Sequence, residues 1–274
     1  MTEVPAMLSR RKFLFGAAAA TLLTSVDVFA IEPSWLDVRQ VRWPVEGLPA
    51  SAEGLRVVQV TDAHLRSLTG QEDRLVQAIK AADCQLVVLT GDLVDHAEAV
   101  PVLREYVAAI RAVVPRVLAI PGNWEHWSGC PFSDVAEAYQ SAGAELLRNQ
   151  SRLVEGIRFV GGDDDLAGFA DHARNARDGV GEHPRVYLCH EPGIFSKKPL
   201  GAKFAAIFSG HTHGGQAQIF GFAPFLPPGS GPYRAGYYDT AWGPLYVSRG
   251  VGTTAVPGRM LCRPELPVFT FVRA

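Results

Sequence analysis

The chain contains 274 residues, of which 47% are hydrophobic and 20% charged, so it is long enough to bury a sizeable core in one large domain or two small ones. This composition excludes disordered, collagen-like and disulfide-dense miniprotein classes. The 26 basic and 28 acidic residues leave a formal charge of −2, so no excess of positive charge indicates nucleic acid or anionic lipid as the partner.

The N-terminus has the features of an export signal. Positions 9–14 read Ser-Arg-Arg-Lys-Phe-Leu and precede an apolar run that ends near Leu23, while Val28 and Ala30 suit a signal peptidase. The run is shorter than the about 20 residues of a membrane span, and the paired arginines resemble a twin-arginine signal. We expect residues 1–30 to be a signal peptide, cleaved after Ala30. The alternative is the basic amphipathic N-terminus of a cytosolic protein.

Export would place the mature chain, residues 31–274, in the periplasm or at the outer face of the cytoplasmic membrane. Its net charge would be −3. Its cysteines form no CxxC pair, which argues against a structural zinc site or a thioredoxin-like redox pair. An oxidising compartment would allow three complete pairings, but buried free thiols are the favoured interpretation. The four cysteines are Cys84, Cys130, Cys189 and Cys262.

In the first half of the mature chain, predicted strands alternate with predicted helices. A lead-in over 33–49 contains Pro and Trp; after it, short β-branched runs predict strands, and apolar residues at helical spacing predict amphipathic helices. The elements are a strand over 55–61, a helix around 75–82, a strand over 85–90, a helix over 100–113 and a strand over 116–120. This alternation indicates an α/β fold.

The second half contains short strand-like runs separated by loops, which predicts a second sheet packed on the first. These runs cover 158–160, 185–189, 204–208, 245–248 and 268–272. A long aromatic loop over 220–238 carries Phe220, Phe222, Phe225 and Leu226, which could line an apolar substrate channel, touch lipid or form the core of the loop. Because the sequence shows no linker, residues 31–274 are expected to form a single domain.

Polar side chains follow five of the predicted strands directly. They are Asp62 and His64, then Asp92, then Asn123, then His190, and finally His211 and His213. Because the carboxyl ends of the strands of an open α/β sheet face the ligand crevice, these seven groups should converge. Oxygen and imidazole donors without thiolate suit Mn, Fe, Zn or Mg rather than copper(I) or iron–sulfur clusters. Seven donors exceed the needs of one ion, so two ions sharing a carboxylate are expected.

These motifs resemble the five signature blocks of the calcineurin-like metallophosphoesterase family. The blocks are Asp62-Ala63-His64, Gly91–Asp95, Gly122-Asn123, His190 and Gly210–Gln216, and the stretches 248–252 and 262–265 are similar to the C-terminal end of its bacterial exported phosphodiesterase branch. The resemblance implies a β-sandwich of two mixed sheets flanked by helices, in four α/β/β/α layers. It also implies one metal ion held by Asp62, His64 and His213, another held by Asn123, His190 and His211, and Asp92 bridging both.

The implied activity is hydrolysis of a phosphodiester by a hydroxide that bridges two divalent ions, manganese before Fe, Zn or Mg. The substrate would be a small or lipid-linked phosphoester. Asp92 is expected to be essential to catalysis because both ions share it. The family His that protonates the leaving group is replaced by Trp124, and His126 could take over if the segment is extended, but not in a helix, where about 200° separates the two positions. A missing acid would favour phosphoanhydrides or aryl diesters as substrates.

Two other functions stay open. One is a pyrophosphatase acting on a nucleotide-linked lipid, and the other is a noncatalytic scaffold protein, although all seven ligand residues are retained. Arg249 could bind a non-reacting phosphate or pair with Glu265, and the acidic run 163–165 is interpreted as a solvated turn. The expected partners are the phosphoester substrate, the twin-arginine export machinery and a peripheral membrane contact. We expect a monomer and no nucleic acid.

Overall fold

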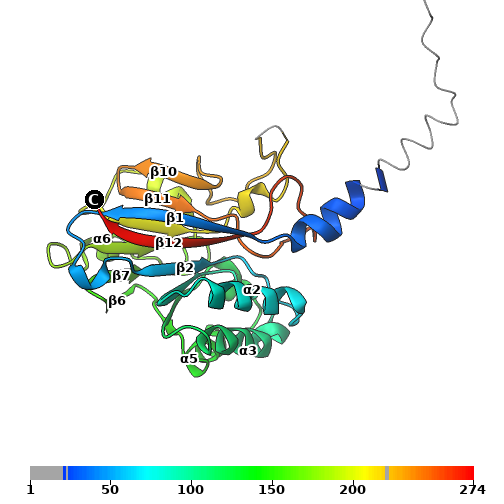
Figure 1. Cartoon of the computed structure of the whole chain (residues 1–274), viewed down its shortest axis with the longest axis horizontal. Helices are drawn as coiled ribbons and strands as arrows, with labels where there is room; N and C mark the ends of the chain where they lie inside the picture. Colours follow the sequence, from blue (N-terminus) through cyan, green and yellow to red (C-terminus); the bar gives the residue numbers. More distant parts are fainter. Residues whose placement is uncertain (1–20, 23, 220–221) are drawn as a thin grey trace, which may run out of the picture.

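Two six-stranded mixed sheets pack face to face, and helices cover their outer faces (Figure 1). The computed structural model describes residues 21–22, 24–219 and 222–274. The paired arginines at positions 10 and 11, most of the apolar run that follows them, and Phe220 lie outside the described residues.

The first sheet has the strand order β1-β12-β2-β3-β4-β5. Its strands are β1 (Asp37–Val45), β2 (Arg56–Val60), β3 (Leu86–Thr90), β4 (Val117–Ile120), β5 (Glu145–Leu146) and β12 (Glu265–Arg273). Strands β2 to β5 run parallel, and β12 is antiparallel to β2 but parallel to β1. The helices on this side of the molecule are α2 (Gly70–Ala81), α3 (Val100–Arg111), α4 (Asn123–Trp127) and α5 (Phe132–Ser141).

Residues on β2 and β3 alternate between two apolar cores. Val58 and Val87 pack toward α2, α3 and α5, whereas Val57 and Leu86 pack between the two sheets. Because both faces of this sheet are covered, its strands read as continuous apolar runs rather than as an alternating pattern. This is why the strands that carry the site residues are the ones most visible in the sequence.

The second sheet has the strand order β10-β11-β9-β8-β7-β6. Its strands are β6 (Gln150–Val154), β7 (Ile157–Gly161), β8 (Arg185–Leu188), β9 (Ala206–Ser209), β10 (Gly236–Thr240) and β11 (Gly243–Val247). A third apolar core joins its outer face to α6 (His172–Arg177) and to the 3-10 turn Pro192–Ser196. Single-turn helical elements also occur at Glu32–Ser34, Ala50–Ala52, Ala97–Ala99 and His213–Gly215. The predicted fold class, two mixed sheets flanked by helices, is confirmed.

The strands that the sequence does not predict lie at or near the sheet edges. Strand β1 falls within the predicted lead-in and pairs only with β12. Its solvent-facing positions include Arg39 and Arg42, and it carries Pro44, all of which are unusual in a central strand. Edge strands need less apolar sequence, so the pattern that reveals β2 and β3 is absent there.

The residues after position 23 form helical turns that contact the C-terminal part of the chain. Residues Asp27–Ile31 form one such turn, and the carbonyl of Val28 accepts a hydrogen bond of 2.9 Å from the backbone N–H of Arg259. The predicted cleavage point after Ala30 lies inside this turn. Among the described residues, no helix is both long and apolar enough to cross a membrane. All four cysteines are free, and only Cys130 is partly exposed.

Candidate metal centre

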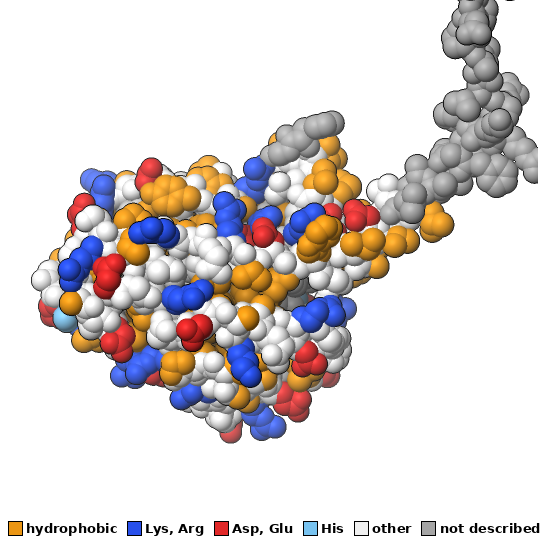
Figure 2. Space-filling model, in the orientation of Figure 1, with side chains coloured by type: hydrophobic (Ala, Val, Ile, Leu, Met, Phe, Trp, Pro, Cys, Tyr) orange, Lys and Arg blue, Asp and Glu red, His pale blue; other side chains and the backbone are white. Residues whose placement is uncertain are grey.

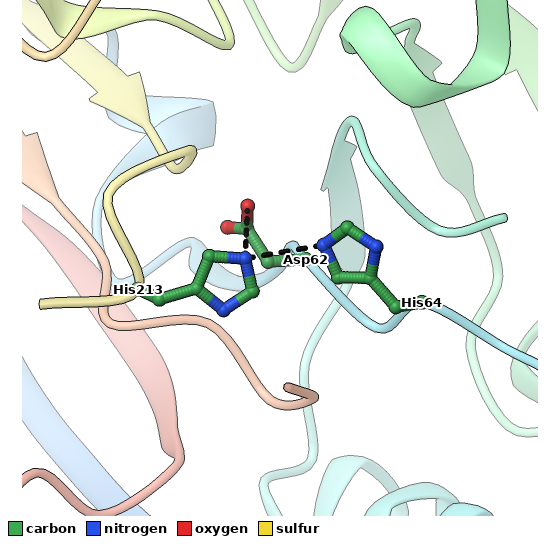
Figure 3. Close-up of side chains that lie close together, drawn as sticks. All are labelled: Asp62, His64 and His213. Carbon is green, nitrogen blue, oxygen red and sulfur yellow. Dashed lines mark hydrogen bonds and ion pairs between the residues drawn. The ribbon is translucent and has the colours of Figure 1, made fainter. Parts of the chain in front are cut away.

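The first group of predicted ligands, which we call the first cluster, consists of Asp62, His64 and His213. Figure 3 shows the two imidazoles and the carboxylate pointing toward one another. The Nε2 atoms of His64 and His213 are 3.1 Å apart, and Nε2 of His213 is 3.4 Å from Oδ1 of Asp62. All three residues are buried, and their ligand atoms lie within 4.8 Å of one another.

The second cluster consists of Asp92, Asn123, His190 and His211. Nε2 of His190 is 3.0 Å from Oδ2 of Asp92 and 3.3 Å from Nδ1 of His211. That Nδ1 is 3.1 Å from Oδ1 of Asn123. Asp92, His190 and His211 also satisfy the 4.8 Å limit for a shared ion.

Asp92 lies between the two clusters. The same Oδ2 atom that approaches His190 is 3.9 Å from Nε2 of His64 in the first cluster. Its other oxygen, Oδ1, accepts a hydrogen bond of 2.8 Å from the backbone N–H of Trp124. The structure therefore brings all seven predicted ligands together at one edge of the sandwich, with the expected carboxylate in the middle; their role as ligands stays a prediction.

The backbone at these ligands is unusual. Five of the seven have a positive φ, a conformation that costs free energy for any residue with a Cβ. These are Asp62, His64, Asp92, His211 and His213. Such strain persists only where surrounding contacts fix it, and its concentration here marks the site independently of residue type.

Gly122 and Glu125 hold the loops after β3 and β4 together. A Cβ at Gly122 would stand 2.5 Å from Oδ1 of Asp92, so only glycine permits this approach. The buried carboxylate of Glu125 accepts hydrogen bonds from the backbone N–H groups of Asp92 and Leu93, both at 2.8 Å, and of Gly122 at 2.9 Å. The hydroxyl of Tyr139 donates a fourth, at 2.9 Å. Sequence reasoning missed Glu125, because nothing local indicates that its partners lie on another loop.

The ring nitrogens that face away from the clusters are held in three different ways. Nδ1 of His190 lies 2.8 Å from the carbonyl of Thr90, and Nε2 of His211 lies 2.6 Å from the carbonyl of Pro228. Such contacts leave the opposite nitrogen free to bind a metal. Nδ1 of His64 is 3.6 Å from the carboxylate of Asp95 instead. Nδ1 of His213 is buried without a partner among the described residues.

The ligand imidazoles differ in pKa. Burial lowers the pKa of His64 and of His190, but neighbouring carboxylates outweigh it and raise both. Burial lowers the pKa of His213 well below its ordinary value, and burial together with His190 lowers that of His211 to about 4, so both imidazoles are neutral at pH 7. Burial raises the pKa of Asp92, but the positive charge and hydrogen bond of His190 outweigh it and bring the value to about 2. Burial raises the pKa of Asp62 to about 6, an effect that a neighbouring cation would oppose.

The residues present fit two divalent ions. In each cluster, ligand atoms of three buried residues lie within 4.8 Å of one another, close enough to share one ion. Each cluster supplies carboxylate and imidazole donors without thiolate, which suits Mn, Fe or Zn. The family to which the motifs point and the two clusters both indicate two metal sites.

His126 does not face the two clusters. The condition for its predicted role, an extended segment, is not met, because Asn123–Trp127 is helical. Its Nε2 is 2.9 Å from Oδ1 of Asp163, and its ring stacks on Phe132 at a centroid distance of 4.6 Å. Trp124 instead lies edge-on to His64, with ring centroids 6.1 Å apart. Trp124 therefore occupies the position of the family His, and the imidazole of His126 is engaged with Asp163.

Two other sequence interpretations are resolved by the structure. Arg249 is paired, with Nε 3.1 Å from Glu265 and Nη2 2.6 Å from Asp37, as the structural alternative expected. The acidic run 163–165 is not a solvated turn, since Asp163 and Asp164 are buried. Nearby backbone N–H groups donate to both carboxylates, and Asp163 also pairs with the more distant side chains of Arg148 and His126.

Comparison with known proteins identifies the family. Residues 55–215 match the family model of the calcineurin-like phosphoesterases. The uncharacterized metallophosphoesterase YkuE of Bacillus subtilis is 31% identical, over 96% of this chain and 97% of that protein. A bovine transmembrane protein with a metallophosphoesterase domain is 29% identical over 93% of this chain, which spans 62% of its length.

Solved structures with a detectable likeness include TT1561 of Thermus thermophilus and a dimetal phosphatase from Danio rerio. Their TM-scores are 0.48 and 0.44, with 10% and 12% identity, and they cover 72% and 73% of this chain and 90% and 88% of their own. The family model spans more than half of the 274 residues and includes all seven residues of the two clusters. The chain therefore belongs to the calcineurin-like phosphoesterase family.

Proposed function

We propose that this protein is a phosphodiesterase that uses two divalent metal ions bound by the first and second clusters. Manganese is the expected metal. The observation that carries the proposal is the position of Asp92, whose Oδ2 lies 3.0 Å from His190 and 3.9 Å from His64. Ions held there would supply Lewis acids for the phosphoryl oxygens and acidify a water molecule.

The residues of the chain position these groups. Outward hydrogen bonds to the carbonyls of Thr90 and Pro228 fix the orientation of two imidazoles, and Glu125 fixes the backbone that carries Asp92. Neither Trp124 nor His126 offers a proton donor to a leaving group at the clusters. Substrates whose leaving group needs no protonation, such as aryl diesters and phosphoanhydrides, are therefore preferred over alkyl monoesters.

The decisive experiment measures hydrolysis of bis(p-nitrophenyl) phosphate by the purified mature chain. We expect activity with Mn²⁺, loss of activity in EDTA and recovery when Mn²⁺ is returned. A protein that binds two metal equivalents yet hydrolyses neither this diester nor a phosphoanhydride would instead support the noncatalytic scaffold.

We further propose that the protein works outside the cytoplasm, at the outer face of the cytoplasmic membrane. The paired arginines and apolar run of the N-terminus support this location, and the bovine relative is named as a transmembrane protein. Replacing Arg10 and Arg11 by Lys should retain the protein in the cytoplasmic fraction. Unchanged export of that double variant would contradict the twin-arginine route.

A further inference from the structure

A cavity of about 290 Å³ adjoins the first cluster, and His64 is the one predicted ligand among its lining residues. The cavity lies between the loop that follows β2 and the loop that follows β11, and it reaches His64 at its inner end. Both loops follow the carboxyl ends of strands, the edge at which α/β folds bind ligands. Its volume is near the lower limit for ligand pockets, so it can hold part of a substrate rather than a whole one.

The lining of this cavity combines buried apolar side chains with exposed arginines and with polar residues, among them Gln71, Glu72 and Thr253. Leu65, Leu75 and Tyr106 line it and are buried, whereas Arg66 and Arg74, which also line it, are exposed. The Arg66 side chain is 73% exposed and lies 3.9 Å from its nearest acidic partner, Asp95. Such a site suits a molecule with an apolar body and an anionic end.

Exposed apolar side chains surround the mouth. Trp35, Leu68 and Val256 are 53%, 43% and 54% exposed, and each either lines the cavity or lies next in sequence to residues that do. Leu261, which is 70% exposed, belongs to the segment 258–262, and its backbone N–H donates to the carboxylate of Glu32. Figure 2 shows hydrophobic side chains gathered at this end of the molecule, where the N-terminal helix projects. Contiguous exposed apolar surface of this kind is typical of lipid or protein contact.

We propose that this cavity binds the alkyl chain of a lipid phosphoester, with the phosphoryl group at the metal centre beside His64. The inference rests on the proposed function and specifies its substrate class. Because neither Trp124 nor His126 offers a proton to a leaving group at the clusters, we assign the alkyl chain to the non-leaving side of the phosphorus. Continuity with His64, the buried apolar side chains of the lining and the apolar residues around the mouth favour an alkyl chain.

The test uses p-nitrophenyl alkyl phosphates whose alkyl group is methyl, butyl or octyl. The p-nitrophenolate is the same leaving group throughout, so the chain on the non-leaving oxygen is the only variable. KM should fall with chain length, by at most about fourfold per methylene, the limit set by complete burial. The kcat should change little.

Two variants fill the cavity from positions that are not fully buried, Ser67→Trp and Thr253→Phe. Both should remove the dependence on chain length and leave the methyl ester unaffected. The control is Gln150→Trp, an exposed position on the edge strand β6, which should keep the dependence. Binding of n-decyl phosphate to the metal-free protein, measured by calorimetry below its micellar concentration, gives a readout independent of turnover and should weaken at least tenfold in the two filled variants only.

The outcomes separate the two proposals. The cavity assignment would be overturned if the KM of metal-dependent hydrolysis did not change with chain length and the filling variants still bound decyl phosphate as the wild type does. The proposed function would then remain intact. If the filling variants abolished decyl phosphate binding but the protein hydrolysed no ester, the cavity assignment would stand and the proposed function would be contradicted.

Discussion

The two clusters of the metal centre are supported by different kinds of contact. In the second cluster, the outward nitrogens of His190 and His211 lie within hydrogen-bond distance of backbone carbonyls. In the first cluster, Nδ1 of His64 lies 3.6 Å from the carboxylate of Asp95, and neither this atom nor Nδ1 of His213 has a hydrogen-bond partner among the described residues. Backbone contacts survive any substitution of the residue that provides them, whereas side-chain contacts do not.

A second side chain, Arg259, holds the backbone next to the first cluster. Its buried guanidinium donates to the carbonyls of Arg249, Gly250 and Gly252 in the loop after β11 and to that of Cys262. That loop is in turn tied to Asp62, whose carbonyl accepts a hydrogen bond from the N–H of Gly252 at 2.9 Å. The first cluster should therefore be the one whose ion is lost first when single side chains are changed.

The largest expected effect comes from the residue that belongs to both clusters. Asp92→Asn should lower kcat/KM at least about 10³-fold and reduce bound metal below one equivalent, because both ions lose their shared carboxylate. Metal analysis and diester hydrolysis measure the two effects. The control, Asp73→Asn on the exposed surface of α2, should change neither. Retention of two tightly bound ions in the Asp92 variant would contradict the inference that the two clusters share this carboxylate.

Glu125→Ala should destabilise the fold while sparing the chemistry of the ligands themselves. Without this carboxylate, the buried N–H groups of Asp92, Leu93 and Gly122 lose their acceptor, at about 1–3 kcal/mol each. The free energy of unfolding in urea should fall by about 3 kcal/mol or more. The exposed Glu137 on α5 provides the matched control, Glu137→Ala, for which a change within about 0.5 kcal/mol is expected. Equal losses in both would contradict the positioning role.

Asp95→Asn tests the asymmetry between the clusters directly. Loss of the carboxylate 3.6 Å from Nδ1 of His64 should weaken one of the two ions about 10- to 100-fold and leave the other unchanged. A two-step Mn²⁺ titration should therefore separate further in the variant than in the wild type. His96→Ala removes the other imidazole partner of Asp95 and should not affect either step. Weakening of both steps by Asp95→Asn would show that the clusters are not independently supported.

The convergence of the seven predicted ligands could be predicted from the sequence because each combines a chemically specific residue type with a place after a buried strand. The helical state of residues 123–127 could not, since it depends on a distant group: Oδ1 of Asp92 accepts the N–H of Trp124 at 2.8 Å. The supporting roles of Arg259 and Glu125 could not be predicted for the same reason, because their partners are backbone groups on other loops. Local sequence predicts which side chains do chemistry better than it predicts which side chains hold them in place.

The smallest expected effect lies outside both clusters, at Asp163. Burial raises the pKa of this carboxyl, but hydrogen bonds from His126, Arg148 and the N–H of Phe169 outweigh it and lower the value to about 2. A carboxyl whose pKa is lower in the folded than in the unfolded protein stabilises the fold above about pH 4 and loses that contribution as the pH falls toward 2. Asp163→Asn should therefore cost about 1–2 kcal/mol at pH 7, with the difference from wild type narrowing below pH 4 in urea unfolding.

Metal content and the Mn²⁺ titration should be unchanged by Asp163→Asn, because its contacts are made to His126 and Arg148 and to no ligand of either cluster. That separation makes it the reference for the three variants above, in which stability or occupancy changes through the metal centre. If Asp163→Asn also lost an ion, His126 and the segment from Asp163 to Phe169 would have to help hold the second cluster in place. The contrast between ligands held by backbone groups and ligands held by side chains would then be wrong.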